Sequence, residues 1–364
     1  MDNWTIGGFF AITIGMSKTA MTLKIRSIDD LLGVVPHLLG FQPTESLVLV
    51  VAEGGRVVVT ARADLAEVAR PGAAEELLGR ITIRFPDASF WLIAYGTAAA
   101  QCWQVLGRCE RFLPADTVAY VVRVDGRRWW ADSPDAPPGV YSPSGNALSE
   151  LAARHGLPAR PSRADLATLV QADPDVDPGA FARAEGLVAA TSASHRPELM
   201  RQTLAESLGG QPDDARCARL AVLADDSDAR DVALLSMDSE DAAAHLTLWR
   251  RVVRRCLPSY QAQVLGLLGM AAWIAGDGAL SVICLERAEA LEPGLPLVEI
   301  LKLTNAMMVS PDSWPEIRRK IAPQPQDAAP QPQDAAPIVP ARRSQRILAR
   351  RTRRAPRSPL RQAC

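Results

Sequence analysis

The stretch "RSIDDLLGVVPHLLGFQPTESLVLVV", residues 26–51, predicts a helix, a turn and a buried strand. Ser27, with Asp30 three residues later, has the form of a capping box, in which side chains bond the first free N–H groups of a helix. Apolar side chains then recur at helical spacing. Pro36 lies inside this pattern and should kink or shorten the helix. Gly40 can take the left-handed conformation that ends a helix, so the Gly-Phe-x-Pro turn reverses the chain.

The residues after this turn predict a mixed α/β sheet. Residues 47–52 are continuously apolar, which is typical of a central strand covered on both faces. A Gly-Gly turn then leads into a second strand. Further strands are expected at 89–96 and in 117–131, with helices around 73–80 and 98–113. This order of elements indicates a sheet with helices packed on it.

The chain divides into five predicted segments. They are an N-terminal extension (1–22), an α/β domain (23–131), a Pro-rich linker (132–146), an all-α helical domain (147–321) and a disordered tail (322–364). The linker holds four prolines within fifteen residues, and such stretches mark loops. The extension is apolar over residues 4–16, too short to span a bilayer, and it lacks the basic region of a signal peptide.

Residues 147–321 are predicted to form Ala- and Leu-rich helices. The clearest pair lies in "QAQVLGLLGMAAWIAGDGALSVICLERAEALEPG", residues 261–294. Gly276 can stop the first helix, and Asp277 can cap the second through its carboxylate. We therefore expect a helical hairpin here.

The tail is basic although the rest of the chain is acidic. Residues 341–364 carry nine Arg and no acid, and residues 322–340 carry two Asp and no base. Subtracting these charges from the net charge of −1 leaves −8 for residues 1–321. The heptapeptide "PQPQDAA" occurs twice from residue 323 and predicts an extended, disordered spacer.

Arginines in the tail are candidates for binding polyanions, either nucleic acid without sequence preference or anionic lipid. A solubilising tail with no dedicated partner is the alternative. The candidate residues are Arg342, Arg343, Arg346, Arg350, Arg351, Arg353 and Arg354.

Cysteine and histidine spacing gives no metal signature. The six Cys form no C-x-x-C pair, and the four His are scattered, so we expect no metal and no cofactor. Cys102 and Cys109 share a helical face, but seven residues along a helix is roughly 10 Å, beyond disulfide reach. The simplest interpretation is a cytoplasmic protein with reduced, buried thiols.

Arg62 and Asp64 are the candidate ligand-binding residues, because they end a strand, where α/β proteins place ligand groups. An ion pair, or a helix cap by Asp64, would explain them equally well. Ser46, His37 and Asp29 could be combined into a hydrolytic set. However, Ser46 begins a strand and no G-x-S-x-G elbow is present, which favours a turn role.

The hairpin "DGRRWW", residues 125–130, pairs Arg with Trp and could stack a base or a sugar. A hairpin with inward-packed Trp and solvated Arg is the commoner structure.

In several of these stretches, the sequence resembles the bacterial family known as domain of unknown function 4192, found chiefly in actinobacteria. The resemblance covers about residues 23–315. It rests on "IRSIDDLLGVVPHLLGFQPTESLVLV", "TARADL", "ARDVALL" and "AAWIAGDGALSVICLERAEALEPG". It implies an α/β region followed by helices, a cytoplasmic location and no particular reaction. It also implies an aromatic residue at position 37, where this chain has His37.

The sequence therefore favours a cytoplasmic binding or regulatory protein that acts through a protein partner. One alternative is an enzyme of unknown class with a pocket near Arg62 and Asp64. A second alternative is a nucleic-acid-associated protein that acts through its Arg-rich tail. The acidity of residues 1–321 argues against a nucleic-acid surface in that part of the chain.

Overall fold

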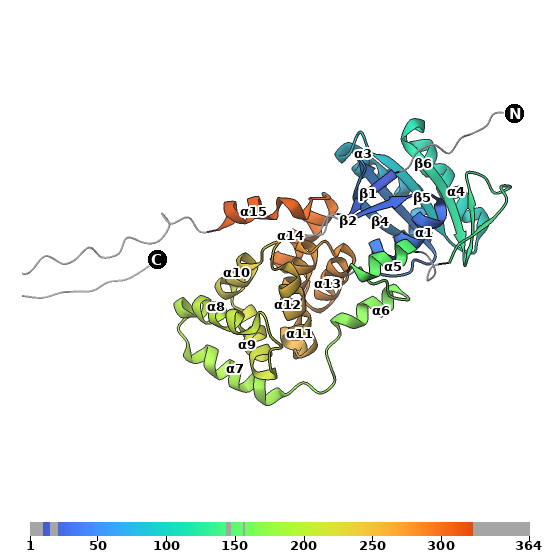
Figure 1. The fold of residues 1–364 in the computed structure, drawn as a ribbon. Helices are drawn as coiled ribbons and strands as arrows, with labels where there is room; N and C mark the ends of the chain where they lie inside the picture. Colours follow the sequence, from blue (N-terminus) through green and yellow to red (C-terminus); the bar gives the residue numbers. More distant parts are fainter. Residues whose placement is uncertain (1–9, 15–20, 143–146, 156, 323–364) are drawn as a thin grey trace, which may run out of the picture. The chain divides into compact units, whose positions relative to one another are not determined.

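The computed structural model describes residues 10–14, 21–142, 147–155 and 157–322, and only the backbone of 10–14 and 21–24. A compact unit ends at Ala322 (Figure 1). The predicted disordered tail and its seven candidate arginines lie outside the described residues, as does most of the predicted N-terminal extension.

A mixed eight-stranded sheet forms the N-terminal part, in the order β2-β1-β4-β3-β5-β6-β7-β8. β3 pairs antiparallel with both β4 and β5, whereas β5 and β6 are parallel. This confirms the predicted mixed sheet. The strands are β1 (Phe10–Ile14), β2 (Met21–Ile25), β3 (Ser46–Glu53), β4 (Arg56–Asp64), β5 (Ser89–Tyr95), β6 (Val118–Asp125), β7 (Arg128–Ala131) and β8 (Gly139–Val140).

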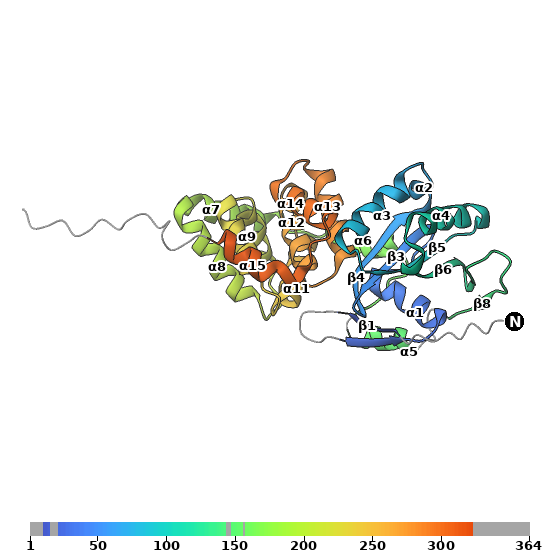
Figure 2. The same ribbon diagram turned by 90° about the horizontal axis from the view of Figure 1, so that it is seen from above.

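Helices cover both faces of the sheet (Figure 2). Successive residues of a strand point to opposite faces, so Leu47 and Leu49 pack with α2–α4, while Val48 and Val50 pack with α1. The continuously apolar run of β3 is therefore buried on both sides, as predicted. The covering helices are α1 (Ile28–Leu39), α2 (Leu65–Val68), α3 (Ala73–Arg84) and α4 (Ala99–Phe112).

The first helix begins and ends where the sequence predicts. The amide of Asp30 donates to Ser27 Oγ, and the Asp30 carboxylate accepts from the amide of Arg26, which completes the capping box. α1 runs through Pro36 to Leu39. Gly40 follows with a φ of 74°, the left-handed conformation that glycine adopts without steric cost.

Two short strands lie inside segments that the sequence assigns to other parts. β1 falls within the predicted N-terminal extension, yet it pairs with β2 and β4. β8 falls within the predicted linker and pairs with β7. The apolar run of residues 4–16 can therefore supply a strand, and turn formers such as Gly139 do not prevent a two-residue edge strand. The five domain boundaries stay predictions.

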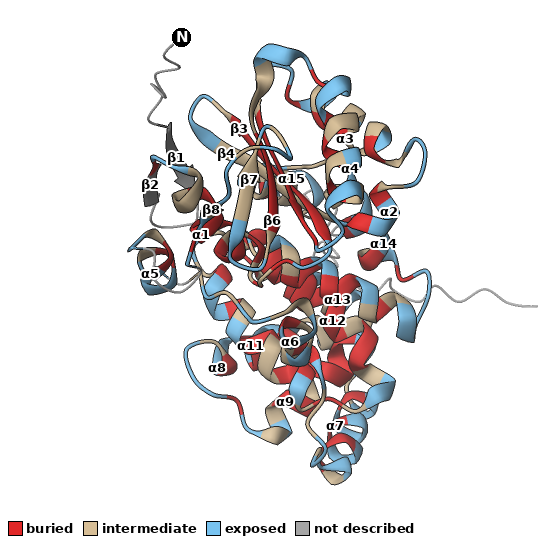
Figure 3. Ribbon diagram, turned by 90° about the vertical axis from the view of Figure 1, so that its right-hand side faces the viewer, coloured by how far each residue is buried: buried red, intermediate tan, exposed pale blue. Residues whose placement is uncertain are grey.

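The described residues from 147 onward contain helices and no named strand. The final hairpin pairs α12 with α13, and Asp277 Oδ1 accepts from the amide of Leu280 as the predicted cap. Figure 3 shows that α12 is mostly buried, and α13 buries one side. The helices are α5 (Ala147–Arg154), α6 (Arg163–Ala167), α7 (Pro178–Ala190), α8 (Arg196–Ser207), α9 (Asp214–Ala224), α10 (Ser227–Ser236), α11 (Ala242–Arg254), α12 (Pro258–Ile274), α13 (Gly278–Leu291), α14 (Pro296–Ala306) and α15 (Trp314–Ile321).

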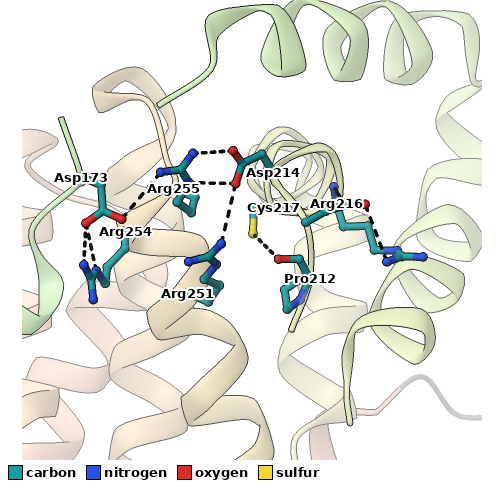
Figure 4. A network of polar contacts seen from close by, with 9 residues as sticks. Asp173, Pro212, Asp214, Arg216, Cys217, Arg251, Arg254 and Arg255 are labelled. Atoms are coloured by element: carbon teal, nitrogen blue, oxygen red, sulfur yellow. Dashed lines mark hydrogen bonds and ion pairs between the residues drawn. The ribbon is translucent and has the colours of Figure 1, made fainter. Parts of the chain in front are cut away.

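An arginine–aspartate network fastens the end of α11 to two other segments (Figure 4). Arg254 donates to Asp173, in the loop before α7, and the nearest distance is 2.7 Å. Arg255 makes a two-pronged contact with Asp214 at the start of α9. This contact lowers the pKa of the Asp214 carboxyl, because the hydrogen bonds from Arg255 favour its charged form. The network therefore has a structural role: it joins the end of α11 to the loop before α7 and to the start of α9.

Candidate functional site

Four strand ends meet at one edge of the sheet. β3 begins there with Ser46, which lies opposite both Asp64 of β4 and Tyr95 of β5. Tyr95 in turn lies beside Val124 of β6. Polar side chains gather at this edge, and we call them the strand-end cluster: Glu45, Ser46, Arg62, Asp64, Thr97, Arg123 and Asp125.

The predicted ligand residues Arg62 and Asp64 are brought together as an ion pair. Arg62 Nη2 donates to Asp64 Oδ1 at 2.7 Å, and Arg62 Nε donates to Ser46 Oγ at 2.8 Å. Ser46 Oγ donates onward to the carbonyl of Thr44 at 2.6 Å. Asp64 stands at the cap position of α2, but its side chain makes no cap bond. Arg62 and Asp64 therefore form the ion pair that the sequence left open as one interpretation. The Asp64 side chain is about half exposed.

Arg123 is the most deeply buried charge of the cluster. Its residue is only 5% exposed, and its guanidinium lies 4.7 Å from the centroid of the Trp130 ring. Nη2 donates to the carbonyls of Gly96 (3.1 Å) and Thr97 (3.2 Å) and to Asp125 Oδ2 (2.8 Å). Its Nε has no hydrogen-bond partner among the described residues. Arg123 thus fixes the junction between β5 and α4.

The N-terminus of α4 is open to solvent at this junction. The residue before the helix is Ala98, which has no side chain to cap it, and the first turn contains no acidic residue. Residues 97–100 are exposed. The first amides of a helix have no partner inside the helix, and its dipole makes this end positive, so it attracts anions.

Glu45 places a carboxylate at this positive end. Its Oε1 accepts from the amide of Thr97 at 3.1 Å and lies 3.4 Å from Thr97 Oγ1. The backbone of Glu45 has a φ of 43°, a left-handed conformation that is uncommon outside glycine. Its carbonyl accepts from the amide of Leu65 at 2.9 Å, which helps to hold this conformation.

Gly96 lets the strand end approach the helix. A Cβ at this position would lie 2.8 Å from Cys102 Sγ and 3.2 Å from Leu65 Cδ2, closer than side chains tolerate. Burial raises the pKa of the Cys102 thiol, although Arg123 acts against this shift, so the thiol is neutral at pH 7. Cys102 therefore serves as a buried core residue at the junction and not as a nucleophile.

The comparison with protein families identifies the family of this chain. A family model described as a domain of unknown function (DUF4192) matches residues 29–312. The chain belongs to the DUF4192 family. Two of the stretches that carry the resemblance, around Ser46 and around Arg62, meet in the hydrogen bond between these residues. No curated protein and no solved structure matched the chain.

The hydrolytic set considered from the sequence, Ser46, His37 and Asp29, is not formed in this DUF4192 protein, because each side chain has other partners. Ser46 bonds Arg62, and Asp29 Oδ1 accepts from Trp129 Nε1 at 2.7 Å. His37 bonds residues of other segments. The bond from Trp129 turns that indole toward α1, while Trp130 lies under Arg123, so the hairpin "DGRRWW" packs both rings against the protein.

Sequence reasoning found Arg62 and Asp64 but missed Glu45, Thr97 and Arg123. A signal for them was present in "AYGTAAAQ", residues 94–101, where a buried strand runs through Gly into a helix that begins with small residues. That pattern suits the close approach of an anion to a helix N-terminus. Arg123 could not be assigned to this site from the sequence, because it reaches the site only through the pairing of β6 with β5.

A second surface lies on α14. Ile300 and Leu303 of this helix and Met307, directly after its last residue, are 62%, 60% and 58% exposed. Val298 and Leu301 on the other side are buried in the core. An apolar stripe of this kind on a soluble surface is typical of a contact site for another protein.

Three further findings concern the described residues only. No helix among them is long and apolar enough to cross a membrane. No group of three His, Cys, Asp or Glu side chains among them is placed to hold a metal ion. Five described cysteines are buried and free.

Proposed function

We propose that this protein is a binding module that holds a small ligand by a phosphate or carboxylate group at the N-terminus of α4. One observation carries the proposal: the Glu45 carboxylate already occupies that position, on the amide and hydroxyl of Thr97. An oxyanion of a ligand would take the same place and the same donors. The exposed residues 97–100 and the absence of an acidic residue from the first turn of α4 support it.

Electrostatics favour this position over other parts of the same edge. A helix of 14 residues carries about half a positive charge at its N-terminus, and no acidic residue in the first turn of α4 cancels it. The partners of Arg62 and Arg123 at the edge are Asp64 and Asp125, so these arginines are already neutralised. Among the described contacts, the acidic side chain at this end of α4 is Glu45, which is exposed and bonds the amide of Thr97 just before the helix.

The test is calorimetric titration with inorganic phosphate, compared with acetate to distinguish the two ligand classes. Thr97→Val removes the hydroxyl at an exposed position and should weaken binding. Glu45→Gln removes the competing charge and should tighten binding by about fivefold, equivalent to about 1 kcal/mol. Glu53→Gln, at the opposite end of β3, is the matched control and should change nothing.

Opposite shifts from Thr97→Val and Glu45→Gln, with an unchanged Glu53→Gln, support the proposal. If Glu45→Gln left the affinity unchanged, or if all three variants shifted it equally, the anion would bind elsewhere on the surface.

A second candidate function, recruitment of a protein partner, is favoured by the apolar face of α14. Val298 and Leu301 anchor the opposite side of this helix in the core, so its exposed apolar side chains are held in place before they meet a partner. Such preorganisation reduces the entropy lost on binding. The two functions are compatible, because ligand binding and partner binding use different elements.

Photo-crosslinking tests this second function. A crosslinkable residue at Leu303 should yield one defined adduct in cells, and the adduct should vanish when Ile300 is changed to Glu. The same residue at Ile83, an isolated exposed apolar position on α3, is the control. Equal adducts from both positions would indicate unspecific stickiness.

An enzyme of unknown class near Arg62 and Asp64 stays an alternative prediction. Replacement of both residues by Ala should abolish such a function and leave Tm nearly unchanged, whereas a large loss of stability would assign the pair a structural role. A cytoplasmic location is also part of the proposal, supported by the five buried free thiols.

A further inference from the structure

His37 and Ser149 come together from helices far apart in the sequence. Ser149 Oγ lies 2.7 Å from His37 Nε2, across 112 residues. His37 Nδ1 lies 2.6 Å from the carbonyl oxygen of Leu157. His37 is 8% exposed and Ser149 is 6% exposed.

The two contacts define where the imidazole proton lies. A carbonyl oxygen only accepts hydrogen bonds, so Nδ1 must carry the proton that faces Leu157. Nε2 of the neutral ring then presents its lone pair to the Ser149 hydroxyl. A serine bonded to a histidine whose other nitrogen is held by an acceptor is the arrangement that activates serine nucleophiles.

A second serine–histidine contact in the chain shows the contrast. Ser192 Oγ lies 2.6 Å from His195 Nδ1, but these residues are three apart, exposed and part of one local turn. No acceptor contact orients the other nitrogen of His195 among the described bonds. Of these two contacts between described residues, that of His37 with Ser149 is both long-range and oriented.

We propose that Ser149 is an acyl-accepting nucleophile, with His37 as its base, for esters that carry an apolar acyl chain. The apolar acyl chain is suggested by four partly buried leucines that pack against Val34, three residues before His37, and Ala152, three residues after Ser149. They are Leu38, Leu148, Leu151 and Leu157. Ser149 is the third residue of α5, so the first amides of this helix lie near its hydroxyl and can stabilise an oxyanion.

The reaction balances with water as the second reactant. Ser149 Oγ bonds to the ester carbonyl carbon, and its proton moves to His37 Nε2. The carbon–oxygen bond to the alcohol breaks, and the alcohol leaves with the proton from Nε2. Water then attacks the acyl group on Ser149, gives a proton to Nε2, and releases the acid as the proton returns to Oγ.

Turnover is expected to be slow, because a backbone carbonyl replaces the carboxylate that orients histidine in triads. In a triad, loss of that carboxylate lowers kcat by about 10⁴. Covalent labelling is therefore a more sensitive test than hydrolysis, since it requires only the first step.

The experiment treats the full chain with a fluorophosphonate reagent and locates the adduct by peptide mass spectrometry. We expect one adduct, on Ser149. His37→Gln keeps a group that can bond Leu157 and Ser149 but cannot take a proton, so labelling should slow by about 100-fold or more. Ser192→Ala is the matched control and should label like the unaltered chain.

Three outcomes would overturn the proposal: no adduct on the unaltered chain, an adduct on another residue, or a labelling rate unchanged by His37→Gln. Because the adduct is mapped on the unaltered chain, the proposal is tested even if His37→Gln does not fold. The anion site at α4 is independent of this result.

Discussion

Replacement of Gly96 by Ala should destabilise the fold through one atom. The added Cβ would lie 2.8 Å from Cys102 Sγ, 3.2 Å from Leu65 Cδ2 and 3.3 Å from Glu45 Oε2. Cys102 and Leu65 are fully buried, so neither can move away cheaply. Overpacking of this kind costs typically about 1–3 kcal/mol, against a gain of about 0.5–1 kcal/mol from the stiffer unfolded chain. A net loss of about 1–2 kcal/mol follows.

The assay is urea denaturation followed by circular dichroism, with Gly79→Ala as the matched control. Gly79 lies inside α3, and the nearest atom to its added Cβ is 3.7 Å away, an ordinary contact. Alanine in a helix interior is favoured over glycine by about 0.5–1 kcal/mol, so this variant should gain stability. The two substitutions therefore have opposite expected signs.

Equal and small effects from both substitutions would refute the reasoning, because they would mean that the strand end and the first turn of α4 are not in close contact. A stabilised Gly96→Ala would refute it most strongly. The candidate anion site depends on this junction, so the site would then lose its geometric basis.

Three further predictions concern other parts of the chain. Gly40→Val should lower the free energy of unfolding by about 1 kcal/mol or more, seen in a thermal melt, because the φ of 74° disfavours a side chain. Asp214→Asn should cost about 0.5 kcal/mol at pH 7, since the carboxylate is partly exposed. Hydrogen bonds from Arg255 lower the pKa of Asp214 in the folded protein. The stability that the carboxylate contributes is therefore present above the unfolded pKa of about 3.9 and is lost as pH falls through the folded pKa. The urea denaturation curves of the unaltered chain and of Asp214→Asn should converge near pH 2. Truncation after Ile321 should abolish salt-sensitive DNA binding, whose log–log slope could approach roughly −8 for nine arginines, and equal binding by both chains would exclude the tail.

Local signals predicted the frame of the fold. The capping pattern at Ser27, the left-handed Gly40 and the Gly-Asp-Gly turn at Asp277 each depend on a few neighbouring residues, and each is confirmed. The central position of β3 was readable for the same reason, since a continuously apolar strand must be covered on both faces.

The site was only half predictable. Arg62 and Asp64 lie two residues apart, so their meeting could be expected from one strand. The contact of Glu45 with Thr97 joins residues 52 apart, and that of His37 with Ser149 joins residues 112 apart. Such contacts depend on strand order and helix packing, which residue spacing does not encode.

The most direct test of the central claim is an NMR titration of the isotope-labelled chain with inorganic phosphate at constant ionic strength. The account predicts saturable shifts of the amide resonances of Thr97, Ala99 and Ala100, at the open end of α4, with a single dissociation constant. The amide resonances at the start of α12, a helix of 17 residues, should not shift. Shifts that do not saturate, or that appear equally at α12, would contradict the claim that α4 holds a specific anion site.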